Sequence, residues 1–275
     1  GISKDDIGEK ITISEYNNAC REAVMKYTSD WESLTKEMGY WINMSDPYVT
    51  FESKYMESVW WIIKEIYNKN LIYKGYTVQP YSPAAGTGLS SHELNQPGCY
   101  RVVKDLSVVA LFRLLDPPRA INTKKPVFMM AWTTTPWTLF ANTGLAVGKK
   151  ITYVFLETIN PYTLESIVVV CAKNCVDWVF DKKTKKLILE KYPKSNSGYT
   201  VLFECLGRDL VDLKYEQCLD YVQPAENPDK AFRVVDADFV NTGGGTGVVH
   251  LAPTFGADDF ATAREKGLPL MLVDS

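Results

Sequence analysis

The stretch Val127-Phe-Met-Met-Ala-Trp-Thr-Thr-Thr-Pro-Trp-Thr138 joins a short apolar run to a polar loop. Its first part, Val127–Trp132, is too short for a typical helix and rich in large apolar side chains, which favours a buried strand. Pro136 pushes the residue before it, Thr135, away from helical and toward extended conformations. The strand is therefore predicted to end where three consecutive threonines present hydroxyl and N–H groups together.

Short apolar runs of this kind recur from about residue 102 to residue 251, separated by turn residues. The predicted strands are Val102–Val103, Ser107–Phe112, Val127–Trp132, Ile151–Leu156, Ile167–Cys171, Lys186–Leu189, Tyr199–Phe203, Ala231–Val235 and Gly247–Leu251. Many short strands at this spacing predict a barrel-like or sandwich-like unit. Short helices are expected at Ala172–Phe180 and at Ala257–Lys266, where Gly267 would end the second one.

The first third of the chain has a helical pattern instead. From Cys20 to Met38 the apolar residues stand three or four apart, as on one face of a helix. A second helix is predicted from Ser53 to about Lys69, with Ser53 as its N-cap. We therefore predict a mixed α/β protein in two parts: a helical connecting segment, residues 1–100, and a mainly β, barrel-like domain with short helices, residues 101–275.

Composition limits the class of protein. The chain has 275 residues, 46% of them hydrophobic and 23% charged, which is enough to bury a sizeable core. Its net charge of −3 is unusual for a protein that works mainly by wrapping nucleic acid, so any RNA contact would be local or depend on a larger parent protein. No apolar run approaches the roughly 20 residues of a membrane span, and no secretory leader opens the chain.

The cysteines and histidines are too few and too scattered for a metal site. Six cysteines contain no CxxC pair, and only two histidines are present, so neither a metal nor another cofactor is expected. Free cysteines suit a reducing compartment, which favours a cytoplasmic location with no membrane partner.

A second polar stretch is Thr242-Gly-Gly-Gly-Thr-Gly-Val-Val-His-Leu-Ala-Pro-Thr-Phe-Gly-Ala-Asp-Asp259. A dinucleotide-binding fingerprint needs a strand before its glycines and a helix after them, whereas here Val248–Leu251 follows as a strand. The glycines therefore indicate a tight turn, a bulge or a close backbone approach. His250 is either a satisfied core or surface group or part of a site. Asp258 and Asp259 either favour a helix N-terminus, or place one carboxylate in a pocket to bind an ammonium.

The threonine stretch also has two physical interpretations. It is either an ordinary β edge, since strands favour threonine and tryptophan, or a set of donors for a carbonyl and ribose hydroxyls. No GxSxG or HExxH motif supplies a nucleophile or a metal. If the protein is a hydrolase, water is the expected nucleophile, and catalysis would rest on positioning.

Together the two stretches resemble the isoleucyl-tRNA synthetase family. The family's threonine-rich editing peptide matches Trp132–Thr138 and continues to Asn142. Its second editing segment matches Gly245–His250 and continues through Ala252-Pro253 and Phe255-Gly256 to Asp259. Relatives for valine and leucine usually carry an arginine after the threonines, so the ending Pro-Trp-Thr favours the isoleucine enzyme. The resemblance extends over most of the chain and implies the connective-peptide editing domain of such an enzyme.

The resemblance also implies roles for residues. Asp259 would hold the α-ammonium group of the amino acid, and Thr133, Thr134 and Thr135 would orient the ester and the terminal adenosine. These four are the predicted catalytic residues. The predicted substrate-binding residues are Trp137, Thr138, Asn142, His250, Phe255 and Asp258.

The implied activity is hydrolysis of valine wrongly joined to isoleucine tRNA, with valyl-adenylate as a further substrate. The implied partners are the valine-charged acceptor end of tRNA(Ile), valyl-adenylate and the rest of the synthetase in cis, which would bind ATP. HIGH-like and KMSKS-like motifs are absent from the sequence, so no aminoacylation is expected from it. Two alternatives stay open: a module that binds the acceptor end without turnover, and an editing domain from a valyl or leucyl relative.

Overall fold

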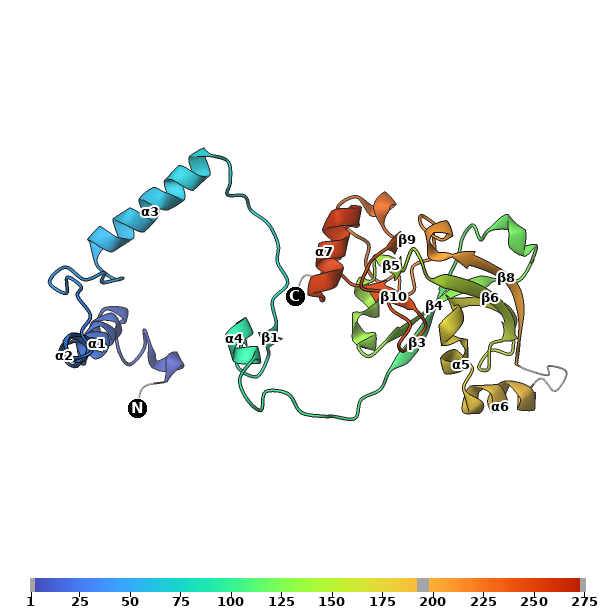
Figure 1. Cartoon of the computed structure of the whole chain (residues 1–275), viewed down its shortest axis with the longest axis horizontal. Coiled ribbons are helices and arrows are strands. Elements are labelled where there is room, and N and C mark those ends of the chain that lie inside the picture. The colour runs from blue at the N-terminus through green and yellow to red at the C-terminus, as the bar shows by residue number, and fades with distance from the viewer. Residues whose placement is uncertain (1–2, 192–197, 273–275) are drawn as a thin grey trace. The chain divides into compact units, whose positions relative to one another are not determined.

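The computed structural model describes residues 3–191 and 198–272. It divides into two compact units, Gly1–Gly75 and Tyr76–Ser275 (Figure 1). Within the described ranges, none of the helices combines the length and apolar character that a membrane span needs. The border between a connecting segment and an editing domain at residue 100 stays a prediction.

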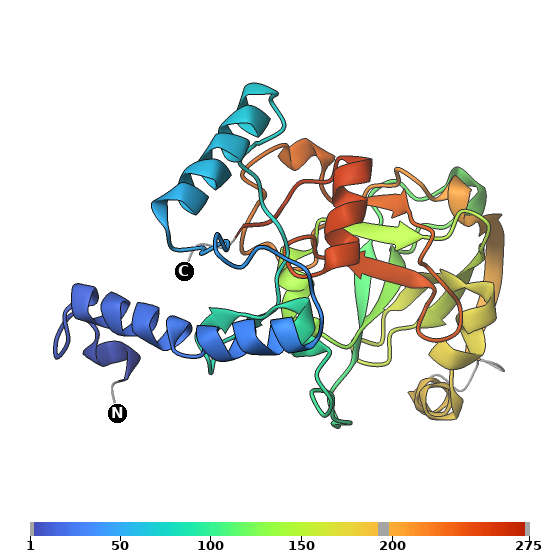
Figure 2. The same cartoon turned by 60° about the vertical axis from the view of Figure 1, so that its left-hand side comes forward.

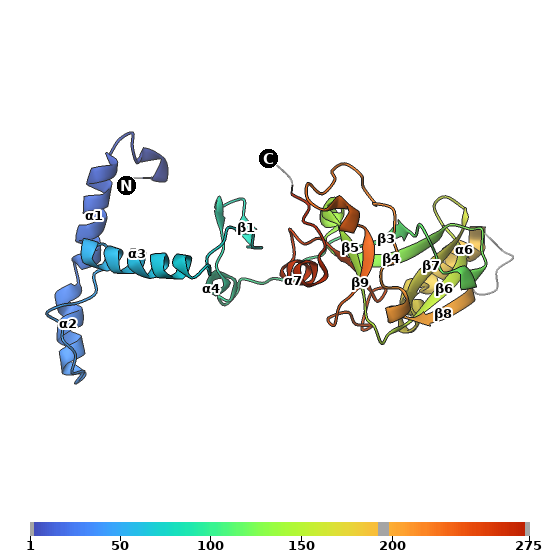
Figure 3. The same ribbon diagram turned by 90° about the horizontal axis from the view of Figure 1, so that it is seen from above.

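The first unit is helical, as expected (Figure 3). The predicted helix Ser53–Lys69 is confirmed, although Glu52 rather than Ser53 is its N-cap. The single helix predicted across Cys20–Met38 is wrong, because the chain leaves helical geometry at Tyr27, with φ −110° and ψ 14°. The helices are the 3₁₀ turn η1 (Lys4–Asp6), α1 (Ile13–Met25), α2 (Thr28–Glu37) and α3 (Ser53–Asn68).

The second unit begins with a short hairpin and one helical turn, β1 (Tyr81–Ser82), β2 (Thr87–Gly88) and α4 (Ser91–Leu94). Two larger sheets follow. The five-stranded sheet has the order β3-β4-β7-β6-β8, and its strands are β3 (Val108–Arg113), β4 (Val127–Thr133), β6 (Thr152–Ile159), β7 (Ser166–Ala172) and β8 (Tyr199–Leu206). The three-stranded sheet has the order β10-β5-β9, and its strands are β5 (Gly144–Val147), β9 (Arg233–Asp236) and β10 (Val248–Leu251).

Alternation along the strands explains the layers. Phe112, Met129 and Phe155 point from one face of the five-stranded sheet into a core shared with Leu145 and Val248 of the three-stranded sheet. The opposite face is covered by the helices α5 (Val176–Val179) and α6 (Lys182–Lys191). The helix α7 (Ala257–Lys266) lies over β5 and β10 (Figure 2). The remaining 3₁₀ turns are η2 (Arg119–Ile121), η3 (Pro136–Ala141), η4 (Lys173–Cys175), η5 (Gly207–Asp209) and η6 (Pro228–Lys230).

The predicted barrel-like closure is wrong. β8 is an outer strand of one sheet and β10 is an outer strand of the other, so the described strands form no closed barrel. The isolated bridges Leu114–Tyr215 and Lys214–Arg233 connect the end of β3 to β9 through residues 214 and 215, and no ladder pairs a described strand of one sheet with a strand of the other. Apolar runs do not specify their pairing partners, and here they pair into two separate sheets that share one core.

The strand predicted at Lys186–Leu189 is also wrong, because these residues lie in α6. The N–H of Thr184 donates to the Asp181 carboxylate at 2.7 Å, which is the geometry of a helix N-cap. Ile188 turns its side chain into the core beside Val179 and Phe180. A single buried residue among lysines leaves too little apolar periodicity to distinguish a helix from a strand. Val102–Val103 has no strand either.

The glycine cluster before β10 permits close backbone approaches, as predicted. Gly247 has a φ of +73°, and a Cβ there would lie 2.3 Å from the Cβ of Ala172. A Cβ on Gly245 would lie 2.9 Å from the Trp132 ring. These glycines let the chain pass directly over β7 and β4 before β10 begins, which places His250 near the end of β4.

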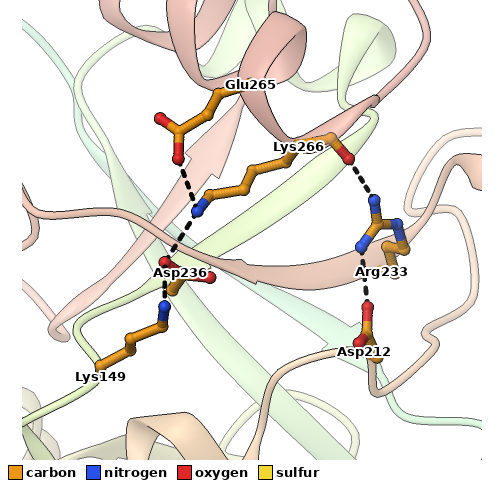
Figure 4. A network of polar contacts seen from close by, with 6 residues as sticks. All are labelled: Lys149, Asp212, Arg233, Asp236, Glu265 and Lys266. Carbon is orange, nitrogen blue, oxygen red and sulfur yellow. Dashed lines mark hydrogen bonds and ion pairs between the residues drawn. The ribbon is translucent and has the colours of Figure 1, made fainter.

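A network of charges fixes the C-terminal end of α7 (Figure 4). The Lys266 and Lys149 ammonium groups contact the Asp236 carboxylate at 2.9 Å and 3.0 Å. Arg233 donates to the Lys266 carbonyl at 2.5 Å and pairs with Asp212 at 2.7 Å. Burial alone would raise the pKa of Asp236, but hydrogen bonds from Lys266 and Lys149 outweigh it and lower that pKa. The network ties α7 to β9 and thereby helps to position the residues at the other end of α7.

Candidate functional site

A cavity of about 350 Å³ lies where the end of β4, the turn η3, strand β10 and the start of α7 come together. The two polar stretches singled out in the sequence supply its walls, although more than a hundred residues separate them. Its lining residues are Trp132, Thr133, Thr134, Thr135, Trp137, Thr138, Val249, His250, Ala252, Phe255, Gly256 and Asp259.

The threonines form a compact turn held by its own hydrogen bonds. The Thr135 N–H donates to Thr133 Oγ1 at 3.0 Å, and Thr138 Oγ1 donates to the Thr135 carbonyl at 2.8 Å. Thr135 has φ −123° and ψ 66°, outside the helical region, as its position before Pro136 predicts. Thr133 and Thr138 are buried, whereas Thr134 and Thr135 are exposed. The exposed pair can therefore offer hydroxyl groups to a ligand.

His250 is a buried wall of the cavity with both ring nitrogens in contact with polar groups. Its Nε2 lies 2.9 Å from Thr138 Oγ1, and its Nδ1 lies 3.2 Å from the amide nitrogen of Asn142. Burial lowers the pKa of His250 to about 4. The imidazole is therefore neutral near pH 7.

Asp259 places a carboxylate in the cavity from the first turn of α7. One oxygen, Oδ2, accepts a hydrogen bond from the Ala252 N–H at 2.9 Å. Gly256 makes room for the side chain, since a Cβ there would lie 2.9 Å from Asp259 Cγ. Burial raises the pKa of Asp259, the bond from Ala252 opposes that shift, and Asp258 adds to it. No lysine or arginine is among the lining residues of the described chain, so a cationic ligand would supply the missing counter-charge.

Aromatic rings surround the threonines and the start of α7. Trp137 meets Phe255 edge to face, with ring centroids 5.8 Å apart, and Phe140 meets Phe255 in the same way at 5.7 Å. Trp137 and Phe255 are exposed and line the cavity. These rings can make apolar and stacking contacts with a ligand.

The cavity gathers eight of the ten predicted site residues. The predicted catalytic residues Thr133, Thr134, Thr135 and Asp259 all line it, as do Trp137, Thr138, His250 and Phe255. Asn142 does not line it and is buried behind His250. Asp258 is exposed on α7 and lies outside the lining. The roles of these residues remain predictions.

The sequence analysis assigned no role in the site to Val249, Ala252, Gly256 or Tyr215. Gly256 directly precedes a predicted helix that starts with two acidic residues, which is a usable signal for an N-cap glycine. Tyr215 donates to the Asn142 side chain at 2.6 Å, but it is a single tyrosine outside any motif. Across the described residues, no group of three His, Cys, Asp or Glu side chains is placed to hold a metal ion.

Comparison with protein families assigns the chain. The family model for class I tRNA synthetases (I, L, M and V) matches residues 1–241. The chain belongs to the class I tRNA synthetase family.

Relatives of high identity to this synthetase chain include isoleucine–tRNA ligases. The ligase of Cytophaga hutchinsonii is 54% identical over 272 residues, which cover 98% of this chain and 24% of the relative. The ligase of Bacteroides thetaiotaomicron is 50% identical over 283 residues, which cover 99% of this chain and 24% of the relative. The predicted resemblance to isoleucyl-tRNA synthetases is thus confirmed, and the chain spans about a quarter of the length of these enzymes.

Solved structures with some likeness to this synthetase chain are leucyl-tRNA synthetase editing domains. The editing domain of the cytosolic leucyl-tRNA synthetase of P. knowlesi has a TM-score of 0.42 and 13% identity, and the match covers 58% of this chain and 62% of that one. The cytosolic domain of P. falciparum has a TM-score of 0.36 and 14% identity, covering 53% and 49%. TM-scores below 0.5 do not establish a common fold.

Proposed function

We propose that this chain is the editing unit of an isoleucyl-tRNA synthetase, and that it hydrolyses the ester of valine wrongly joined to isoleucine tRNA. Valyl-adenylate is a second proposed substrate. The observation that carries the proposal is the single cavity formed by the threonine stretch and by the segment with His250 and Asp259.

Asp259 is the proposed anchor for the amino acid. The carboxylate is held through one oxygen by the Ala252 N–H, which leaves the other oxygen available to a ligand. Burial without a cationic neighbour in the lining raises its pKa, and the α-ammonium group of an aminoacyl ester would compensate that charge. Asp258 carries the same charge but is exposed outside the cavity, so we assign the ammonium contact to Asp259.

The cavity walls are the proposed basis of size selection. Valine lacks one methylene of isoleucine, and isoleucyl-tRNA synthetase is itself the standard illustration that such a difference is worth only about 1–3 kcal/mol in a binding pocket. A second site that admits valine and sterically excludes isoleucine adds the discrimination that the first cannot supply. The indole of Trp137 and the buried imidazole of His250 are the proposed excluding walls.

Water is the proposed nucleophile. Its oxygen bonds to the ester carbonyl carbon, the bond from that carbon to the ribose oxygen breaks, and the ribose oxygen takes a proton. Free valine and tRNA are the products. The exposed hydroxyls of Thr134 and Thr135 would orient the ester and the terminal ribose, and the neighbouring ribose hydroxyl would assist the attack. Thr133, Thr138 and Phe255 complete the proposed binding surface.

The remaining functions belong to the proposed parent enzyme. The rest of the synthetase in cis, its ATP site and most of its tRNA contacts lie outside a chain that spans about a quarter of its relatives. Since the HIGH-like and KMSKS-like motifs are absent, we expect no amino-acid activation from these residues. We also propose a cytoplasmic location, in keeping with the proposed role in protein synthesis.

The test compares two esters on the same tRNA. The chain is incubated at high concentration with isoleucine tRNA carrying valine or carrying isoleucine, and release of each free amino acid is followed. Release of valine but not of isoleucine is expected. If both esters persist although the chain binds the charged tRNA, the chain is a binding module and not a hydrolase. Equal release of both amino acids would contradict size selection.

A control tests the ribose assistance separately. Valine is placed on tRNA whose terminal ribose lacks the free neighbouring hydroxyl. Release should slow strongly, because the proposed assistance is lost. Undiminished release would remove the ribose hydroxyl from the mechanism and leave the threonines as the orienting groups.

A further inference from the structure

Tyr215 is a buried tyrosine that contacts Asn142, outside the lining of the cavity. Its side chain is 1% exposed and packs edge to face against Phe112, with ring centroids 5.4 Å apart. Burial holds the pKa of its hydroxyl well above the ordinary value, so the group keeps its proton. It donates that proton to Asn142 Oδ1 at 2.6 Å. This contact shows which end of the Asn142 side-chain amide is the oxygen, because the Tyr215 hydroxyl donates to it.

The amide nitrogen of Asn142 faces three acceptors. It lies 2.8 Å from the Gly144 carbonyl, 3.3 Å from the Leu251 carbonyl and 3.2 Å from His250 Nδ1. Turning the amide over would place its oxygen against two carbonyl oxygens, which is repulsive. The orientation with nitrogen toward His250 is therefore fixed from both ends of the amide.

This orientation decides where the proton of His250 lies. Nδ1 faces an N–H donor and must accept, so in the neutral ring the proton is on Nε2. Nε2 then donates to Thr138 Oγ1 at 2.9 Å, and Thr138 donates its own proton to the Thr135 carbonyl at 2.8 Å. Every donor in this chain of contacts meets an acceptor. A second proton on Nδ1 would point at the Asn142 amide hydrogens.

We propose that Tyr215 and Asn142 are positioning residues that hold His250 as a neutral imidazole with its proton on Nε2, so that His250 is a fixed wall of the cavity and not the base of the hydrolysis. The statement that His250 is not the base of the hydrolysis rests on the proposed function, whereas the tautomer of His250 does not. Neither ring nitrogen has a free lone pair for a proton from water. Of the other lining residues in the described chain, Asp259 is the one with a titratable side chain.

Nitrogen-15 NMR of histidine reads the tautomer directly. The chain contains two histidines, and the His92→Gln variant assigns their signals, because His92 is exposed and remote in sequence. For His250 we expect a protonated Nε2 and an unprotonated Nδ1, unchanged between pH 8 and pH 5. A proton on Nδ1 at neutral pH, or titration of the ring with a midpoint near 6.5, would overturn the proposal.

Asn142→Asp reverses the contact at Nδ1. A carboxylate still accepts from Tyr215 but cannot donate to His250, so the proton should move to Nδ1 or both nitrogens should become protonated. If that variant does not fold, Tyr215→Phe gives the milder change: Asn142 loses the donor that holds its oxygen, and the Nδ1 and Nε2 signals should shift toward averaged values. Wild-type signals in every folded variant of the two would overturn the proposal.

Tyr153→Phe is the matched control. Tyr153 is also fully buried, and its hydroxyl makes two hydrogen bonds, to Gly148 and Gly247, without touching His250 or Asn142. Its removal should cost similar stability and leave the His250 signals unchanged. On valine-charged tRNA, Tyr215→Phe should lower kcat about tenfold with little change in KM, as expected for a misplaced wall. If no variant and no wild-type chain releases valine, the proposed function fails while the NMR result still decides the tautomer.

Discussion

Elements of both units have a regular apolar pattern, but the burial of their apolar residues differs between the two units. In the first unit no residue of α1, α2 or α3 is buried, and Trp60 of α3 is 75% exposed. In the second unit Phe155 is fully buried between two sheets. Periodicity therefore identifies the apolar face of an element but does not say what covers it. The apolar faces of the two larger sheets in the second unit are covered by residues of that same unit.

A pair of core-size substitutions should separate the two units most strongly. Phe155→Ala is expected to lower the free energy of unfolding by about 3–5 kcal/mol, because it removes a buried ring and leaves a cavity. Trp60→Ala is expected to change it by less than about 0.5 kcal/mol. Urea unfolding followed by circular dichroism measures both. A comparable loss for Trp60→Ala would show that α3 is covered after all.

The charge network at α7 should make a smaller, pH-dependent contribution to the free energy of unfolding. Asp236→Ala removes contacts with Lys266 and Lys149 and should cost about 1–2 kcal/mol at pH 7. Because the pKa of Asp236 is lowered by folding, its contribution is present above the unfolded pKa of about 3.9 and is lost as the pH falls through the folded value. The difference between variant and wild type should thus shrink below about pH 4. A constant difference down to pH 2 would contradict this origin.

Asp259 should behave in the opposite way. Its pKa is raised by burial, so its charge opposes folding at neutral pH, and this penalty disappears as the pH falls below the raised value. Asp259→Asn keeps an acceptor for the Ala252 N–H and should leave stability equal or higher, by less than about 1 kcal/mol. Thermal unfolding at pH 7 checks the sign. A clear loss of stability would indicate a structural rather than a ligand-binding role.

Much of the second unit could be predicted from the sequence, because its strands are apolar runs between turn residues. Strand β5, Gly144–Val147, was missed since it is short and begins with glycine. The sheet pairing was not predictable, because apolar runs do not encode their partners, and the expected barrel was wrong for that reason. The helix α6 lacked periodicity among its lysines.

The site was predictable where chemistry is local in sequence. Three threonines before a proline and an aspartate in the first turn of a helix are motifs, and the fold brings them to one cavity. The position of Asn142 behind His250 was not predictable from the sequence, because it depends on the pairing of β5 with β10. Tyr215 acts through a single long-range contact with Asn142, for which the sequence contains no signal.

Deleting the first unit should have the smallest effect on stability. Since the hydrophobic cores of the second unit are built from its own residues, residues 76–275 alone should unfold at the same temperature as the whole chain. Differential scanning calorimetry of both chains makes the comparison. A lower melting temperature for the shortened chain would mean that the helices support the sheets.

The two neighbouring aspartates provide the most direct test of the editing site. Valine release from valine-charged isoleucine tRNA is measured under single-turnover conditions for the chain, for Asp259→Asn and for Asp258→Asn. We predict at least a tenfold loss for Asp259→Asn, because a charge-assisted bond to the ammonium contributes about 1.5–3 kcal/mol, and a much smaller change for the exposed Asp258. Undiminished release by Asp259→Asn, or equal losses in both variants, would contradict an editing site built around the Asp259 carboxylate.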